Sequence, residues 1–536
     1  MALVALSGNG NKAVTRLGVC LAALIAAAGV GAASGTPALA KNTITVNVVQ
    51  VFRSIDPAKM SDYADYMAAF NFYDPLVTVA EGGKLEPALA ESWKVSDDGK
   101  EFTFKIRDDA KFTDGSPVEA SDVVYSVERL LKINQGPASL FEGVLGDGSV
   151  KAVDNKTVTF TLKKTFSPFL SMVPSIMILN ANVVKENAGN DDGQTYLSTH
   201  VAGAGAYSLK SWERGARMIM ERNQNYYKGF RENPIDEVRF VITNDESTVR
   251  SLAASGELTL SSAYQAPETY EALKAMGRFD IKKFNTATGF YLKLNTKVAP
   301  TDDIHIRKAI ALATDYKTIR EVITTGGVLS GPLPEAFGKF HADDIPAPEY
   351  DLQAAKAEVE KSKYAGSPIP ITLGYVSGTK VAEELTLLMQ SNLEQIGFKV
   401  TQEGNPWNRV TDLATKVDTT PAVNQVYFGP TYPSPDSMFY TQYHSKAAGT
   451  WASMEWLQNP EIDKLIDQAR ATSDENRQIE IYKELQHKIV DLQPDVFVLT
   501  MTAQLAIDKC LDGYKYVPMQ SVSYSFSRYS WTCKQK

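Results

Sequence analysis

The sequence predicts an α/β protein built from several lobes. The 536 residues are long enough for three or four compact units, at a prior of about one domain per ~150 residues. Hydrophobic residues make up 44% and charged residues 22%, which is close to an ordinary soluble globular protein. From residue 43 onward, runs that alternate apolar and polar residues are interspersed with runs at helical spacing. Mixed elements of this kind are typical of α/β folds.

The first third of this pattern begins with an alternating strand at residues 43–49, TITVNVV. Residues 64–79 look helical and then extended. Phe102, Phe104 and Ile106 alternate with polar residues, and a helix follows in which Ser121 or Asp122 is a plausible N-cap. A further alternating strand is expected at residues 157–162.

The middle and last thirds repeat the pattern. A hairpin is expected over 207–210 and 217–221, because both runs have strand character and are short. The other expected strands are 238–242, 289–294, 369–375 and 398–401. The other expected helices are 248–255, 304–313, 382–396, one opened by Asn459-Pro460, and 476–491.

The N-terminus reads as a secretory signal peptide at residues 1–40. Lys12 and Arg16 precede an apolar run at 17–35, and Ala38-Leu39-Ala40 forms a small-residue cleavage site. We therefore expect a mature protein that begins at Lys41 in a bacterial periplasm, with a retained N-terminal anchor as the alternative. No later apolar run approaches the ~20 residues of a membrane span.

Cleavage there would leave two cysteines, Cys510 and Cys533. An even number in an oxidising compartment favours a disulfide between them, and two buried free thiols are the alternative.

Composition and motifs exclude several classes of function. The net charge is -8, so the chain has no electrostatic footprint for nucleic acid. The five His residues are scattered, and no H-E-x-x-H, C-x-x-C, P-loop or G-x-S-x-G motif occurs. The sequence therefore predicts no catalytic residues, no metal site and no cofactor.

Residues 86–131 carry a family resemblance. The stretch EPALAESWKVSDDGKEFTFKIRDDAKFTDGSPVEASDVVYSVERLL resembles the signature of the family 5 extracellular solute-binding proteins, the peptide, opine and nickel class of ABC-importer receptors. The match has the family's spacing over its full length. Further matches lie at 201–209, 221–229, 235–260, 294–296, 303–310 and 459–485.

The resemblance implies a two-lobed periplasmic binding protein of the cluster C type, with two hinge strands and an extra domain inserted in the first lobe. Its ligand would lie in a cleft between the lobes. Carried over, lobe I would be residues 41–77, 198–287 and 503–536, the inserted domain 78–197, and lobe II 288–502.

The resemblance also implies ligand-binding residues. Trp407, in EGNPW, matches a cleft Trp of the peptide receptors. In the segment 427–436, Phe428 takes the place of a second Trp, Thr431 takes the place of an Asp, and Tyr432 follows. In the family, that Asp pairs with the α-ammonium group of a peptide. The uncharged Thr431 therefore weakens the interpretation that this protein binds ordinary peptides. Tyr264 is a further pocket candidate, and core packing is the alternative for Trp407 and Phe428.

The predicted function is a non-enzymatic periplasmic receptor that delivers a small organic solute, a peptide or peptide-like compound, to the permease subunits of an ABC transporter. An opine- or oligosaccharide-binding member is the alternative within the class, and a secreted hydrolase is the alternative outside it. The expected partners are the ligand and the permease, with no nucleic acid, and the protein is expected to be a monomer.

Overall fold

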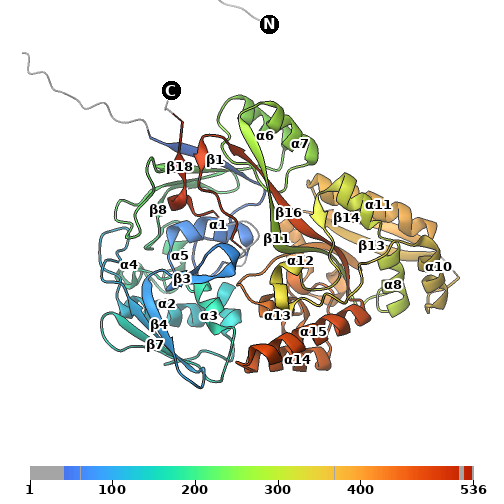
Figure 1. The fold of residues 1–536 in the computed structure, drawn as a ribbon, viewed down its shortest axis with the longest axis horizontal. Helices are drawn as coiled ribbons and strands as arrows, with labels where there is room; N and C mark the ends of the chain where they lie inside the picture. Colours follow the sequence, from blue (N-terminus) through green and yellow to red (C-terminus); the bar gives the residue numbers. More distant parts are fainter. Residues whose placement is uncertain (1–40, 61, 367, 518–523, 534–536) are drawn as a thin grey trace, which may run out of the picture. The chain divides into compact units, whose positions relative to one another are not determined.

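The computed structural model describes residues 41–60, 62–366, 368–517 and 524–533 (Figure 1). They form a mixed α/β structure with three principal sheets. The expected signal peptide and its cleavage site before Lys41 lie outside the described residues. In the part of the chain that is described, none of the helices has the length and apolar character needed to span a bilayer.

The first sheet has the strand order β1-β10-β9-β8. Strand β1 (Thr43–Val48) runs parallel to β10 (Glu237–Ile242), and β9 (Arg217–Arg222) and β8 (Tyr207–Glu213) continue it antiparallel. The strand at 43–49 and the hairpin over 207–221 are therefore confirmed. Helix α1 (Tyr63–Phe72) packs its buried side chains into the same core. We call this sheet with α1, α6 (Glu246–Ala254) and α7 (Pro267–Ala275) the first lobe.

The second sheet has the order β4-β5-β7-β6. Its strands are β4 (Ala90–Val95), β5 (Glu101–Ile106), β7 (Thr157–Thr161) and β6 (Val150–Ala152), and helix α2 (Ala120–Ile133) packs beside them. The alternating Phe102, Phe104 and Ile106 are all buried, as predicted. The α2 cap differs from the prediction: Glu119 is the N-cap, and the Asp122 carboxylate accepts a bond from its backbone N–H at 2.9 Å. We call this part the inserted sheet.

The third sheet has six strands in the order β12-β16-β11-β15-β13-β14. We call it, with the helices that cover it, the second lobe. Its strands are β12 (Gly326–Gly327), β16 (Asp495–Asp508), β11 (Phe279–Leu294), β15 (Val423–Phe428), β13 (Ile369–Val376) and β14 (Phe398–Asn405).

Strands β11 and β16 are the two crossing strands (Figure 1). They pair antiparallel from Phe279 with Asp508 to Lys293 with Asp495, and the register shifts between Asn285 and Gly289 and again between Phe290 and Tyr291. Near one end Leu260 of the first lobe bridges Ile507. The sequence predicted only residues 289–294 of β11, because residues 280–285 are largely polar and part of a ribbon exposed to solvent.

A buried charge network fixes the other end of the crossing strands. Lys293 Nζ lies 3.0 Å from Asp495 Oδ2, 3.0 Å from Gln442 Oε1 and 3.3 Å from Glu455 Oε2. The side chains of Lys293, Asp495 and Glu455 are 0% exposed. Burial raises the pKa of Glu455 to about 8, and it also raises that of Asp495. A single cation therefore neutralises two buried acids only in part.

Four helices of the second lobe lie where the sequence predicts them, near 304–313, 382–396, after Asn459 and near 476–491. Asn459 is the N-cap of the third of these, and its side chain accepts the N–H groups of Glu461 and Ile462. The main helices here are α8 (Ile304–Leu312), α10 (Leu352–Lys361), α11 (Lys380–Gln395), α12 (Trp407–Leu413), α13 (Pro435–Tyr443), α14 (Pro460–Ala471) and α15 (Glu475–Leu492). The shorter elements elsewhere are β2 (Val77–Val79), β3 (Leu85–Pro87), α3 (Phe169–Met172), α4 (Ala181–Glu186), α5 (Gln194–Leu197), α9 (Tyr316–Thr318), β17 (Leu511–Asp512) and β18 (Ser530–Trp531).

A disulfide joins Cys510 to Cys533. It lies beside the short antiparallel pair β17-β18, in which Leu511 faces Trp531. The covalent link and the strand pair together attach the end of the chain to the first lobe.

Candidate ligand-binding cleft

Aromatic side chains from both lobes meet where the crossing strands join them. Tyr63 is the first residue of α1, and its ring lies 5.7 Å from that of Trp451, which belongs to the short 3₁₀ turn Trp451–Ser453 of the second lobe. Trp451 also contacts Trp407 at 5.2 Å and Phe428 at 5.8 Å. We call Tyr63, Trp407, Phe428 and Trp451 the aromatic cluster. Its edge-to-face and tilted geometries are favourable for aromatic pairs.

Polar contacts cross the same boundary. The Tyr63 hydroxyl donates to the carbonyl of Gly429 at 3.1 Å and accepts the Gly429 N–H at 3.1 Å. The Trp407 indole Nε1–H donates to Asp62 Oδ2 at 2.5 Å. At the surface, Lys380 of α11 pairs with Glu268 of α7 at 2.8 Å. The two lobes are therefore in direct contact in this structure.

Three of the predicted site residues are only partly buried. Trp407 begins α12 after Pro406 and lies in the aromatic cluster. Tyr264 packs edge-on against Tyr427 of β15, with ring centroids 6.0 Å apart. Thr431 has its backbone N–H bound by the Ser437 hydroxyl at 2.8 Å. Thr431 thus lies two residues beyond the Gly429 contact with the first lobe.

The other two predicted residues are fully buried. Phe428 ends β15 and packs in the second-lobe core beside Trp451. The ring of Tyr432 lies in the core of the inserted sheet, and its hydroxyl donates to Asp436 Oδ2 at 2.7 Å. The structure thus brings Trp407 and Phe428 together around Trp451, whereas Tyr432 points to a different core.

Asp436 ends the segment 427–436 and is an acid that could pair with a ligand's ammonium group in place of Thr431. Its carboxylate is buried and engaged, because Arg470 Nε lies 3.3 Å from Oδ1 and Tyr432 bonds Oδ2. Burial raises the pKa of Asp436, and the charge of Arg470 opposes that shift. Asp436 does not cap α13, since Ser434 is the N-cap and its side chain accepts the N–H of Asp436.

Two further carboxyls occupy the start of α1. Asp62 caps the helix through Oδ1, which accepts the Ala64 N–H at 3.2 Å. Asp65 accepts the backbone N–H groups of Arg53 and Ser54 at 2.6 and 3.1 Å. Burial raises the pKa of Asp62, while burial and the nearby charge of Asp62 raise that of Asp65 to about 7. Both acids are therefore poorly solvated.

Two small cavities share Tyr264 and enclose about 40 and about 10 Å³. The larger lies between the lobes and also reaches Tyr427 and Gln504, whereas the described lining of the smaller, which includes Asn47 and Met67, belongs to the first lobe. Their described lining residues carry no charge. Since one water needs roughly 10–15 Å³, neither cavity is large enough for a peptide.

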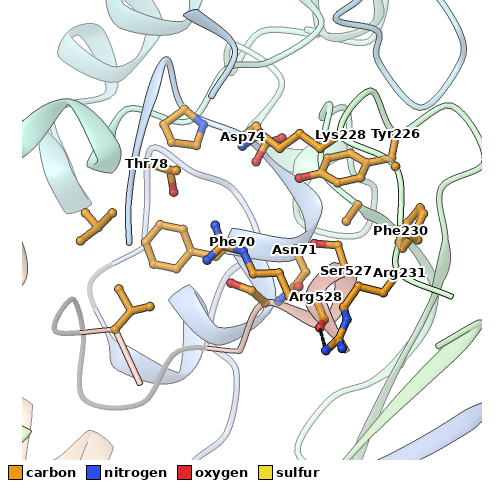
Figure 2. Close-up of a pocket in the computed structure, with 16 residues that line it drawn as sticks. Phe70, Asn71, Asp74, Thr78, Tyr226, Lys228, Phe230, Arg231, Ser527 and Arg528 are labelled. Atoms are coloured by element: carbon orange, nitrogen blue, oxygen red, sulfur yellow. Dashed lines mark hydrogen bonds between the residues drawn. The ribbon is translucent and has the colours of Figure 1, made fainter. Parts of the chain in front are cut away.

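A larger pocket of about 340 Å³ lies within the first lobe (Figure 2). The described residues that line it come from segments 70–79, 206, 226–231, 517 and 525–528. Arg231 there is held by the Asp512 carboxylate at 2.8 Å and by the carbonyl of Arg528. The second lobe adds no described residue to this pocket.

The structure describes no group of three His, Cys, Asp or Glu residues that could hold a metal ion. It does place at the boundary three residues that sequence analysis missed, namely Asp62, Tyr63 and Trp451. Asp62 reads as an ordinary N-cap, which it also is. Trp451 stands alone in a loop segment, GTWAS, with no periodicity to mark it. Only the cross-lobe contacts single these residues out.

Comparisons with known proteins agree with this architecture. Residues 84–450 match the model of "Bacterial extracellular solute-binding proteins, family 5 Middle". The probable D,D-dipeptide-binding periplasmic protein DdpA of Escherichia coli is 31% identical over 491 residues, covering 90% of this chain and 93% of its own. The periplasmic oligopeptide-binding protein OppA of Salmonella typhimurium is 26% identical over 514 residues, covering 89% and 91%.

Solved structures show the same fold. The periplasmic binding protein DppA of Helicobacter pylori, in complex with the peptide STSA, superposes with a TM-score of 0.81 at 22% identity. The match covers 92% of this chain and 98% of that one. The two-lobed fold with an inserted sheet is therefore the fold of these periplasmic binding proteins. By its sequence and its architecture, the chain belongs to the family 5 bacterial extracellular solute-binding proteins.

Proposed function

We propose that this protein is a periplasmic receptor that captures a peptide or peptide-like compound between its lobes and delivers it to an ABC transporter permease. The observation that carries the proposal is the cross-lobe contact between Trp407 and Asp62, beside Trp451. Aromatic walls suit the apolar side chains of a peptide. The names of the relatives DdpA and OppA support the same ligand class.

Closure of the lobes around the ligand marks the receptor as loaded. A ligand that contacts both lobes binds the closed form better and so shifts the population toward it. The permease can then distinguish a loaded from an empty receptor by shape. In this mechanism the protein acts by binding alone and performs no chemical step on its ligand.

A thermal-shift screen tests the proposal. The secreted protein is heated with di- to pentapeptides, opines, oligosaccharides and nickel, and a ligand that binds only the native state raises the apparent stability by mass action. We expect stabilisation by peptides. Stabilisation by opines or oligosaccharides alone would refute the peptide class.

An opine or oligosaccharide ligand remains the second candidate. Thr431 favours it, because a hydroxyl replaces the acid that would pair with a peptide's ammonium group. The two small cavities beside Tyr264 have no charged residue in their described lining, which agrees with a ligand of low charge.

We propose the same division of the chain as the family resemblance implies, with residues 1–40 as a cleaved signal peptide and the mature protein as a periplasmic monomer. Mass spectrometry of the secreted protein gives the N-terminus, which we expect at Lys41. Light scattering gives the oligomeric state. A mature N-terminus far from Lys41 would contradict the proposed cleavage site.

A further inference from the structure

A peptide receptor of this kind needs an anion for the ligand's amino end. A buried ammonium without a counter-charge is strongly unfavourable. Thr431 offers a hydroxyl, and the Asp436 carboxylate already holds Arg470 and Tyr432. The acid that would receive the ammonium group must therefore come from elsewhere in the cleft.

Asp62 is a buried carboxyl without a cation. Its side chain is on a residue only 5% exposed, and Asp65 beside it is 1% exposed. Among the described residues, no Lys, Arg or His lies within ion-pair distance of either carboxyl, and Arg53, whose charge lowers the pKa of both, is exposed. Asp65 Oδ2 is buried and has no hydrogen-bond partner. Two adjacent acids thus lack the positive charge that usually accompanies burial.

Asp62 lies at the boundary between the two lobes. Its Oδ2 accepts the indole N–H of Trp407 from the second lobe, so the carboxyl lies on the boundary that closes over a ligand. Each oxygen of Asp62 accepts one of the hydrogen bonds described above, and a carboxylate oxygen has two acceptor positions. Asp62 can therefore accept a further donor while α1 stays capped and Trp407 stays bound.

We propose that Asp62, on the first lobe, is the carboxylate that binds the cationic amino group of the ligand, with Asp65 behind it adding negative charge. The ligand class is then a peptide with a free α-ammonium, or a compound with an equivalent primary amine. This inference rests on the proposed function, and it moves the charge partner from the segment around Thr431 to the opposite lobe.

The test compares one ligand with and without its charge. The screen above identifies the peptide that stabilises the protein most, and calorimetry then measures its Kd and that of its N-acetyl form. For the wild type we expect the N-acetyl form to bind roughly 10- to 100-fold more weakly, because a hydrogen bond to a charged group is lost. The ratio of the two Kd values is the decisive quantity.

Asp62→Asn should bring that ratio close to one, chiefly by weakening the free-amine peptide. Asn has a single acceptor oxygen, so this variant also disturbs the contact with Trp407. Trp407→Phe is the matched control, because it breaks the same contact and leaves the charge in place. It should weaken both ligand forms alike and preserve the wild-type ratio.

The outcomes separate the two proposals. If the wild type binds both forms equally, or if Asp62→Asn preserves the wild-type ratio, the role of Asp62 is refuted while the peptide receptor stands. If no peptide stabilises the protein, the proposed function fails and the inference fails with it. Should Asp62→Asn not fold, the wild-type ratio still decides, because a ratio near one overturns the inference without any variant.

Discussion

The contact between Trp407 and Asp62 allows a quantitative test of closure. Trp407→Phe removes the indole N–H and keeps an aromatic ring near Trp451, 5.2 Å away in the wild type. A hydrogen bond to a charged group contributes about 1.5–3 kcal/mol. Because this bond joins the two lobes, its loss weakens the closed form and leaves the core of each lobe intact.

We therefore expect the affinity for the best peptide to fall by roughly 10- to 150-fold, as the same free energy implies. The free energy of unfolding should change by less than about 1 kcal/mol, as is usual for a residue outside the core. Calorimetry measures the affinity and urea unfolding the stability. Trp93→Phe, a half-buried Trp on β4 of the inserted sheet, is the matched control and should change neither.

Two results would refute this reasoning. An affinity within twofold of the wild type would mean that the contact is absent from the ligand-bound form. A loss of several kcal/mol of stability, with normal binding by the folded fraction, would assign Trp407 to the core instead of the cleft.

Three further predictions concern stability. Arg129→Met leaves Asp56 buried without its bidentate partner, whose two hydrogen bonds are 2.6 and 2.7 Å long, and should lower the free energy of unfolding measured in urea by about 3–5 kcal/mol. Breaking the exposed ion pair between Lys105 and Glu91 should change it by under about 1 kcal/mol. A small loss in the Arg129 variant would contradict the argument from the buried pair. Burial raises the pKa of Asp65 to about 7, against 3.8 when unfolded, so the folded protein binds more protons between these values and stability falls by up to about 4 kcal/mol as the pH rises from about 4 to 7. Asp65→Asn should flatten this slope between about pH 4 and 7, and an unchanged slope would refute it. Reducing the disulfide between Cys510 and Cys533, which closes a loop of 23 residues, should lower the free energy of unfolding by about 3 kcal/mol. An unchanged midpoint of urea unfolding would show that the stability of the protein does not depend on the disulfide.

Sequence patterns predicted the elements that bury one regular face. Phe102, Phe104 and Ile106 mark their strand because each alternate side chain enters a core. Asn459 marks its helix because its side chain caps the first turn. The outer half of β11 was missed for the opposite reason: residues 280–285 are stabilised by pairing with β16 more than by burial.

The site was predictable only where a family motif marks it. Trp407 was selected by its place after a glycine-containing strand, and the structure brings it to the lobe boundary. Asp62 and Trp451 were not predicted, because an N-cap acid and a lone loop Trp have many ordinary explanations. Their importance depends on contacts between residues several hundred positions apart, which spacing along one sequence does not reveal.

The irregular pairing of the crossing strands determines how the lobes can move. Pairing of β11 with β16 is regular up to Asn285, then shifts register between Asn285 and Gly289 and again between Phe290 and Tyr291, while a buried ion pair joins Lys293 to Asp495 beyond these shifts. We therefore expect the ribbon to bend most easily near residues 286–288, so that opening of the lobes is a rotation about an axis close to these residues. In such a rotation the displacement of an atom grows with its distance from the axis. Substitutions at 286–288 should then alter the rate of opening while every ligand contact stays unchanged.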